Sequence, residues 1–160
     1  GEELGIYGMK DKGDEYVRSP MLWGDSYTTS YTDKIDGGVA SSIKSVLEQK
    51  ENNSSLLNTY ITFTKLRNTY PSLAEGKMTK HAVYNESNTA YKTLAAWYMT
   101  KDNEKMLVLH NVGSSVIQIS LSDKIEKAVG VSGDVQQKKE GDNVLVKLGA
   151  YTSVVYKITQ

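Results

Sequence analysis

The hydrophobic residues that follow residue 76 alternate with polar ones, and this pattern constrains the fold more than any other feature. Ile117, Ile119 and Leu121 alternate with Gln118 and Ser120, which is the period of a strand with one buried face. Turns rich in Gly, Asn and Asp separate such segments at short intervals. The candidate strands are 77–84, 92–100, 105–112, 115–121, 125–131, 134–139, 143–148 and 152–159. This arrangement predicts a mainly β fold, either an antiparallel sandwich or a barrel.

An amphipathic helix over residues 54–69 precedes the predicted strands. Asn53 or Ser54 is a candidate N-cap, and Pro71 is expected to end the helix. The apolar side chains fall on one face, formed by Leu56, Tyr60, Phe63, Leu66 and Tyr70.

Residues 1–38 are rich in glycine and show neither helical nor strand periodicity. Gly37 and Gly38 mark a turn, and residues 39–49 fit either a short helix or an extended segment. An irregular segment of this length is usually functional or packs against another part of the protein. Because the sequence opens inside this segment, without a methionine, we expect it to be part of a longer chain.

The charge balance and composition exclude several functional classes. The 19 basic and 19 acidic residues cancel, and this balance argues against a nucleic-acid binder, which needs a basic face. It has no cysteine, which excludes disulfides and thiolate chemistry, and no apolar run approaches the roughly 20 residues that span a bilayer. Its 11 tyrosines and 2 tryptophans are aromatic residues with a polar group, which suits partly solvent-exposed surfaces, including surfaces on which sugars stack.

No residue pattern supplies catalytic machinery or a metal site. The acidic pairs at residues 2–3 and 14–15 are adjacent in sequence, so on an extended chain their side chains point to opposite faces. His81 and His110 are the only histidines, and they cannot supply the three or four ligands of a zinc site. We therefore predict no catalytic residue and no metal ligand in this chain.

Arg18 and Trp23 are the candidate binding residues. A guanidinium and an indole five residues apart in a glycine-rich loop can hydrogen-bond to a sugar and stack on it. In the competing interpretation, Arg18 pairs with Asp14 or Glu15 and Trp23 covers a seam between domains. The residues alone favour neither interpretation.

The opening residues resemble the α-amylase family, glycoside hydrolase family 13. The resemblance rests on GEELG at residues 1–5 and RSPMLW at residues 18–23, which are similar to the run that follows the eighth barrel strand in that family. Residues 55–73 resemble the family's last barrel helix, and residues 106–112 the central strand of its C-terminal domain. The resemblance implies that residues 1–74 end a (β/α)8 barrel and residues 75–160 form a C-terminal Greek-key β-sandwich.

The resemblance also implies a function. The chain would be the C-terminal part of an enzyme that cleaves α-1,4-glucosidic bonds of starch or maltooligosaccharides, secreted or held at a bacterial cell surface. The catalytic carboxylates would lie in the missing N-terminal barrel portion, so this chain alone would be inactive. Arg18 matches an arginine that contacts glucose in related enzymes, and Trp23 would line the same cleft. No cofactor is expected here, while the whole enzyme could bind calcium.

Two alternatives stay open. The chain could be a carbohydrate-binding β-sandwich that uses exposed aromatic residues such as Trp97 or Tyr91. It could also be the C-terminal part of an α-glucosidase or cyclomaltodextrinase, because Ser19 and Leu22 differ from the Thr-Pro-Met-Gln-Trp run of some relatives. That difference leaves endo and exo action undecided.

Overall fold

The computed structural model describes residues 1–8, 10–18, 20–24, 43–84 and 92–159. The chain forms two compact units, Gly1–Thr62 and Phe63–Gln160. Each unit has its own architecture and is described separately below. The predicted domain division after residue 74 concerns a larger protein and stays a prediction.

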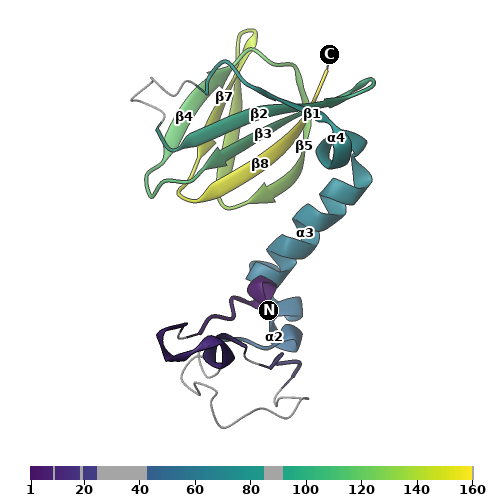
Figure 1. Ribbon diagram of the computed structural model, residues 1–160. Coiled ribbons are helices and arrows are strands. Elements are labelled where there is room, and N and C mark those ends of the chain that lie inside the picture. Colours follow the sequence, from purple (N-terminus) through teal and green to yellow (C-terminus); the bar gives the residue numbers. More distant parts are fainter. Residues whose placement is uncertain (9, 19, 25–42, 85–91, 160) are drawn as a thin grey trace. The chain divides into compact units, whose positions relative to one another are not determined.

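The second unit is a two-layered antiparallel β-sandwich (Figure 1). One sheet has the strand order β1-β2-β3-β8-β5, and the other has the order β4-β7-β6. The chain crosses between the sheets after β3, β4, β5 and β7, and β8 inserts between β3 and β5, as in Greek-key sandwiches. The mainly β, antiparallel prediction is confirmed. The strands are β1 (Lys77–Lys80), β2 (Leu94–Lys101), β3 (Glu104–Asn111), β4 (Ile117–Leu121), β5 (Ile125–Ser132), β6 (Val135–Glu140), β7 (Asn143–Leu148) and β8 (Thr152–Ile158).

The core of the sandwich lies between the two sheets. It is formed by alternate residues of β2, β3, β4, β7 and β8, each of which turns one apolar face inward. Ile119 and Leu121 on β4 meet Val146 and Leu148 on β7, as the alternation in the sequence predicts. Leu107, Leu109, Val154 and Tyr156 supply the facing layer from the other sheet.

The first strand is shorter than the predicted 77–84, for a reason visible at its end. His81 donates its backbone N–H to Ala96, and the chain then turns, so that Tyr84 N–H bonds back to His81. The His81 ring is buried and takes a hydrogen bond at Nδ1 from Val83 N–H. Its Nε2 therefore carries the proton and donates to Asp123, at 2.8 Å. These contacts of His81 end the pairing of β1 with β2.

The predicted helix is present as α3 (Leu56–Thr69). Its cap differs from the prediction, because Ser55 rather than Asn53 or Ser54 accepts the Asn58 N–H. Pro71 ends α3 as expected, but it also begins a second short helix, α4 (Pro71–Glu75). The other helices among the described residues are α2 (Val46–Glu51) and three 3₁₀ turns, η1 (Glu2–Leu4), η2 (Lys10–Lys12) and η3 (Asp14–Val17).

Helix α4 is fixed to the sheet by a carboxylate at its first turn. Glu104 on β3 accepts hydrogen bonds from the Ser72 backbone N–H, at 2.9 Å, and from the Ser72 hydroxyl, at 2.7 Å. A negative charge at the N-terminus of a helix is stabilising, and Ser72 is fully buried. Arg67 on α3 donates to the carbonyls of Leu73 and Ala74, which joins α4 to the end of α3.

Two tyrosines of the sandwich, the half-buried Tyr98 and the fully buried Tyr156, differ in how their hydroxyls are satisfied. Tyr98 donates to the Asp123 carboxylate, at 2.7 Å, and burial, then this bond and the charge of Asp123, raise the pKa of Tyr98. The hydroxyl of Tyr156 is buried without a hydrogen-bond partner among the described residues, and burial raises the pKa of Tyr156 to about 12. An unsatisfied buried hydroxyl costs free energy, whereas one that is bonded to a charge stabilises the fold.

The same substitution should therefore have opposite effects at these two positions. We expect Tyr156→Phe to raise the free energy of unfolding by about 1 kcal/mol, because it removes a polar group that gains nothing from burial. Tyr98→Phe should lower it by about 2 kcal/mol, because Asp123 loses a buried donor. Urea unfolding of both variants and the parent chain measures this. Equal losses in the two variants would contradict the assignment.

Candidate functional site

The opening loop contains short 3₁₀ turns and two glycines at positions that a larger residue would not fit without strain. Gly5 has a φ of 78° and follows η1, where a left-handed residue ends the turn. A Cβ on Gly8 would lie 2.1 Å from the Tyr16 carbonyl oxygen, so only glycine allows these two parts of the loop to approach. The described part of residues 1–38 therefore contains local turns, where the sequence predicted no regular structure. The predicted turn at Gly37 and Gly38 lies outside the described residues.

Gln49 on α2 connects the opening loop to both helices of this unit. It is 6% exposed, and its amide nitrogen donates to the carbonyls of Leu4 and Lys44, each at 3.0 Å. Its side-chain oxygen accepts the Leu57 N–H, one of the unpaired amides in the first turn of α3. One amide side chain thus satisfies backbone groups from three separate segments.

The backbone carbonyl of Gln49 extends this network. It accepts hydrogen bonds from the Ser55 hydroxyl, at 2.6 Å, and from the Asn58 amide, at 2.9 Å. Asn58 also donates to the carbonyls of Lys50 and Asn52, which lie at the C-terminal end of α2. The last carbonyls of α2 and the first amides of α3 are therefore satisfied by side chains rather than by water.

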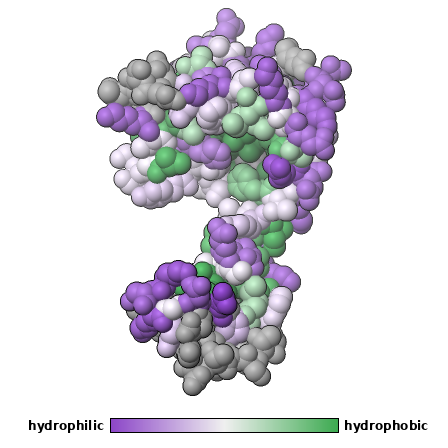
Figure 2. Space-filling model, viewed as in Figure 1, coloured by the Kyte–Doolittle hydropathy of each residue, from purple (hydrophilic) through white to green (hydrophobic). Residues whose placement is uncertain are grey.

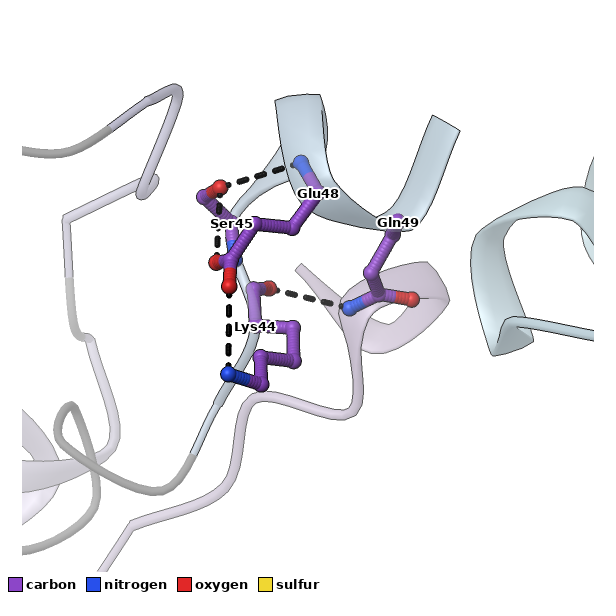
Figure 3. A network of polar contacts seen from close by, with 4 residues as sticks. All are labelled: Lys44, Ser45, Glu48 and Gln49. Atoms are coloured by element: carbon purple, nitrogen blue, oxygen red, sulfur yellow. Dashed lines mark hydrogen bonds and ion pairs between the residues drawn. The ribbon is translucent and has the colours of Figure 1, made fainter. Parts of the chain in front are cut away.

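The start of α2 is fixed by a capping box (Figure 3). The Ser45 hydroxyl accepts the Glu48 N–H, and the Glu48 carboxylate accepts the Ser45 N–H at 2.9 Å. Lys44 pairs with the same carboxylate at 3.1 Å. The hydrogen bond from Ser45 N–H, followed by the contacts with Lys44 and the Ser45 hydroxyl, lowers the pKa of Glu48.

The first turn of α2 also holds the chain at Trp23. The carbonyls of Leu22 and Trp23 accept the N–H groups of Val46 and Leu47, at 2.9 and 3.1 Å. The backbone of Trp23 is therefore fixed against the capped helix, while its indole is 51% exposed. This is the geometry of an aromatic side chain presented to solvent from a supported backbone.

Arg18 lies on the exposed surface of the same loop. Its side chain is 76% exposed, and its guanidinium is 3.9 Å from Asp14, which also pairs with Lys10. This ion pair belongs to the competing interpretation of Arg18, but a long, exposed contact contributes little stability and leaves the guanidinium accessible. The roles of Arg18 and Trp23 in substrate binding stay predictions.

Among the described carboxyl groups of the loop, Glu3 lacks the raised pKa that a glycosidase general acid needs. The pKa of Glu3 is lowered, first by a hydrogen bond from its own backbone N–H and then by the terminal ammonium, 3.2 Å away. Asp14 is exposed and paired with cations. Over the described residues, no group of three or more His, Cys, Asp or Glu side chains could hold a metal ion.

Residues 94–155 match the family described as the α-amylase SusG C-terminal domain. The chain is also similar to α-amylase SusG of Bacteroides thetaiotaomicron, with 62% identity over 159 residues. The resemblance to the C-terminal part of an α-amylase family enzyme is confirmed. The match covers 99% of this chain but 23% of SusG, so the chain spans less than a quarter of that relative.

Two solved structures share the fold of this chain. An α-amylase from H. orenii superimposes with a TM-score of 0.78 at 23% identity, covering 99% of this chain and 31% of that one. A trehalulose synthase from Pseudomonas mesoacidophila gives a TM-score of 0.70 at 21% identity, covering 89% and 25%. Proteins named for different reactions therefore share this architecture, and the fold alone does not choose among reactions.

The sequence predicted Arg18 and Trp23 as binding residues but missed the groups that hold the loop. The capping box at Ser45 and Glu48 was visible as Ser-x-x-Glu before a helix. Of the ambiguous segment 39–49, the described part contains a helix from Val46, and residues 39–42 lie outside the described residues. Gln49 gave no sequence signal, because its role depends on Leu4, which is distant in the chain. No helix among the described residues is long and apolar enough to cross a membrane.

We expect Gln49→Leu to loosen the loop without unfolding the sandwich. The substitution removes three side-chain hydrogen bonds and leaves buried carbonyls without a donor, at a cost of about 2 to 4 kcal/mol. Hydrogen exchange of the Leu57 amide, with limited proteolysis of the opening loop, measures this. Lys50→Gln, on an exposed position of the same helix, is the matched control. Equal protection in the two variants would contradict the role of Gln49.

Proposed function

We propose that this chain is the C-terminal part of an α-amylase-type glycoside hydrolase that cleaves α-1,4-glucosidic bonds of starch or maltooligosaccharides. The observation that carries the proposal is the 62% identity to α-amylase SusG along nearly the whole chain. Fold similarity to a second α-amylase supports it. The catalytic carboxylates would come from a preceding barrel, because this chain matches only 23% of SusG.

The exposed apolar residues of the first unit fit this proposal. Leu56 and Tyr60 on α3 are 43% and 40% exposed, although the sequence places them on the apolar face of the helix. Hydrophobic residues are visible at the surface around this part of the chain (Figure 2). We propose that this face packs against the barrel, which would make the residues before this chain an intramolecular partner.

Within the whole enzyme, Arg18 and Trp23 would face the glucan. The fixed backbone and exposed indole of Trp23 suit stacking on a pyranose ring. The exposed guanidinium of Arg18 has donors available for sugar hydroxyls. In this proposal the loop shapes the cleft while residues elsewhere carry out the chemistry.

The location and cofactors follow from the same proposal. A starch-degrading enzyme has to meet a polymer too large to cross a membrane, so we propose an extracellular or cell-surface site. We assign no cofactor to this chain, and calcium binding by the whole enzyme stays a prediction. An α-glucosidase or cyclomaltodextrinase remains the alternative within the family, and an independent carbohydrate-binding sandwich the alternative outside it.

A chimera tests the proposal. Residues 1–160 would replace the aligned segment of SusG, and we expect the chimera to hydrolyse soluble starch, while the 160 residues alone release no reducing sugar. Arg18→Ala and Trp23→Ala should each lower kcat/KM of the chimera about tenfold, the effect of losing one charge-assisted hydrogen bond or one stacking contact.

Matched controls lie in the same loop. Lys12→Ala removes another exposed cation, and Tyr7→Ala removes an aromatic residue that is 61% exposed. Both should leave kcat/KM unchanged. A folded chimera without hydrolysis, or a 160-residue chain that hydrolyses starch, would refute the proposed function. Equal effects of the controls and of Arg18→Ala would remove Arg18 from the cleft.

A further inference from the structure

Tyr151 combines an unfavourable backbone with an exposed ring. It lies in the turn between β7 and β8, has a φ of 50°, and is 70% exposed, the highest fraction among the large hydrophobic residues described. A bulky residue with positive φ is an outlier that costs about 1 to 3 kcal/mol and commonly marks a functional position. Asp102 has the same φ, but it sits in the two-residue turn between β2 and β3, where aspartate is favoured.

The turn that carries Tyr151 is rigidly supported. Tyr151 N–H donates to the Gly113 carbonyl, at 3.0 Å, which joins this turn to the loop between β3 and β4. Beneath them, the fully buried Asn111 amide donates to the carbonyls of Ser115 and Gly149, at 2.8 and 2.7 Å. The ring is therefore presented from a fixed backbone, which limits the entropy lost when a ligand binds.

A row of polar, uncharged side chains follows Tyr151 on the five-stranded sheet. His110, Ser153 and Ser132 lie in register across β3, β8 and β5, and each is half-buried. His110 Nδ1 is 2.7 Å from the Ser153 hydroxyl, and burial lowers the pKa of His110, so the imidazole is neutral at pH 7. Residues 111–116 and 149–153 contain no charged side chain. The exposed Asp134 lies beside this turn: its carbonyl accepts the Gly149 N–H, and a Cβ on Gly149 would lie 3.1 Å from the Asp134 Cβ.

Other clusters in the described residues do not offer such a surface. His81, Tyr98 and Asp123 are bonded to one another, and the His81 and Asp123 side chains are only 7% and 9% exposed. Trp97 lies at 5.2 Å from the Tyr84 ring and is half-buried, which leaves it less accessible than Tyr151. Tyr91, the other aromatic residue expected from the sequence, lies outside the described residues.

We propose that Tyr151 and the His110–Ser153–Ser132 row form a glucan-binding site on the β-sandwich. The choice of an α-glucan rests on the proposed function. An aromatic ring beside neutral hydrogen-bonding groups matches a pyranose, which has an apolar face and hydroxyls at its edge. The site would hold the polymer at a place that contains no catalytic group.

Affinity electrophoresis of the 160-residue chain in native gels tests this site. Soluble starch in the gel should retard the parent chain, and a β-linked glucan should not. Tyr151→Asn removes the ring but tolerates positive φ, so it should keep the fold and weaken retardation about tenfold. Tyr151→Phe keeps the ring and should bind as the parent does. Ser153→Ala is a second variant, expected to bind several-fold more weakly.

Each of the following outcomes would contradict the proposed glucan-binding site at Tyr151. Absence of retardation of the parent chain by starch, equal retardation by the β-linked glucan, or unchanged binding by folded Tyr151→Asn would overturn the site. A large loss of thermal stability in Tyr151→Asn would assign the ring a structural role instead. Loss of binding in Trp23→Ala but not in Tyr151→Asn would place the glucan on the opening loop. None of these results changes hydrolysis by the SusG chimera, which tests the proposed function separately.

Discussion

The first unit depends on one buried amide, because it has almost no hydrophobic core. Among its described residues only Leu4 and Val46 are buried and apolar, whereas Ser45, Gln49 and Ser55 are buried and polar. Such a unit cannot rely on area removed from water and has to satisfy its buried polar groups. Gln49 does most of this through bonds to the loop and to α3. A unit built in this way is expected to gain stability from whatever covers its exposed apolar residues.

The β-sandwich, in contrast, is stabilised mainly by burial of apolar side chains. Its core is a continuous apolar layer from both sheets. Buried polar side chains such as Asn111 and Thr152 form hydrogen bonds with backbone groups of the loops at the strand ends. Strands with a fully buried face tolerate little register error, so the sandwich holds its loops in fixed positions. This rigidity is what allows a strained residue such as Tyr151 to persist at a turn.

The two units suggest a division of labour in the whole enzyme. The opening loop carries Arg18 and Trp23, and the backbone of Trp23 is bonded to the capped helix α2. Neither side chain can activate a nucleophile or transfer a proton at neutral pH. The sandwich offers a row of neutral polar side chains, His110, Ser153 and Ser132, across β3, β8 and β5. Both parts are suited to binding a neutral polymer, and the chemistry would belong to carboxylates placed by the barrel. The variety of reactions among proteins of this fold agrees with that separation.

The sequence by itself determined the elements and their order. Alternation with a period of two, together with the turn residues, predicted the eight strands that the structure describes, because five of them bury an apolar face in the core. The apolar stripe with Pro71 located α3. The sequence also showed that Arg18 and Trp23 share a loop. Only the tertiary structure decided which residues hold that loop, since Gln49 reaches Leu4 across 45 positions. The positive φ of Tyr151 was equally hidden, because a backbone outlier is imposed by the fold around it and not by the residue's own preference.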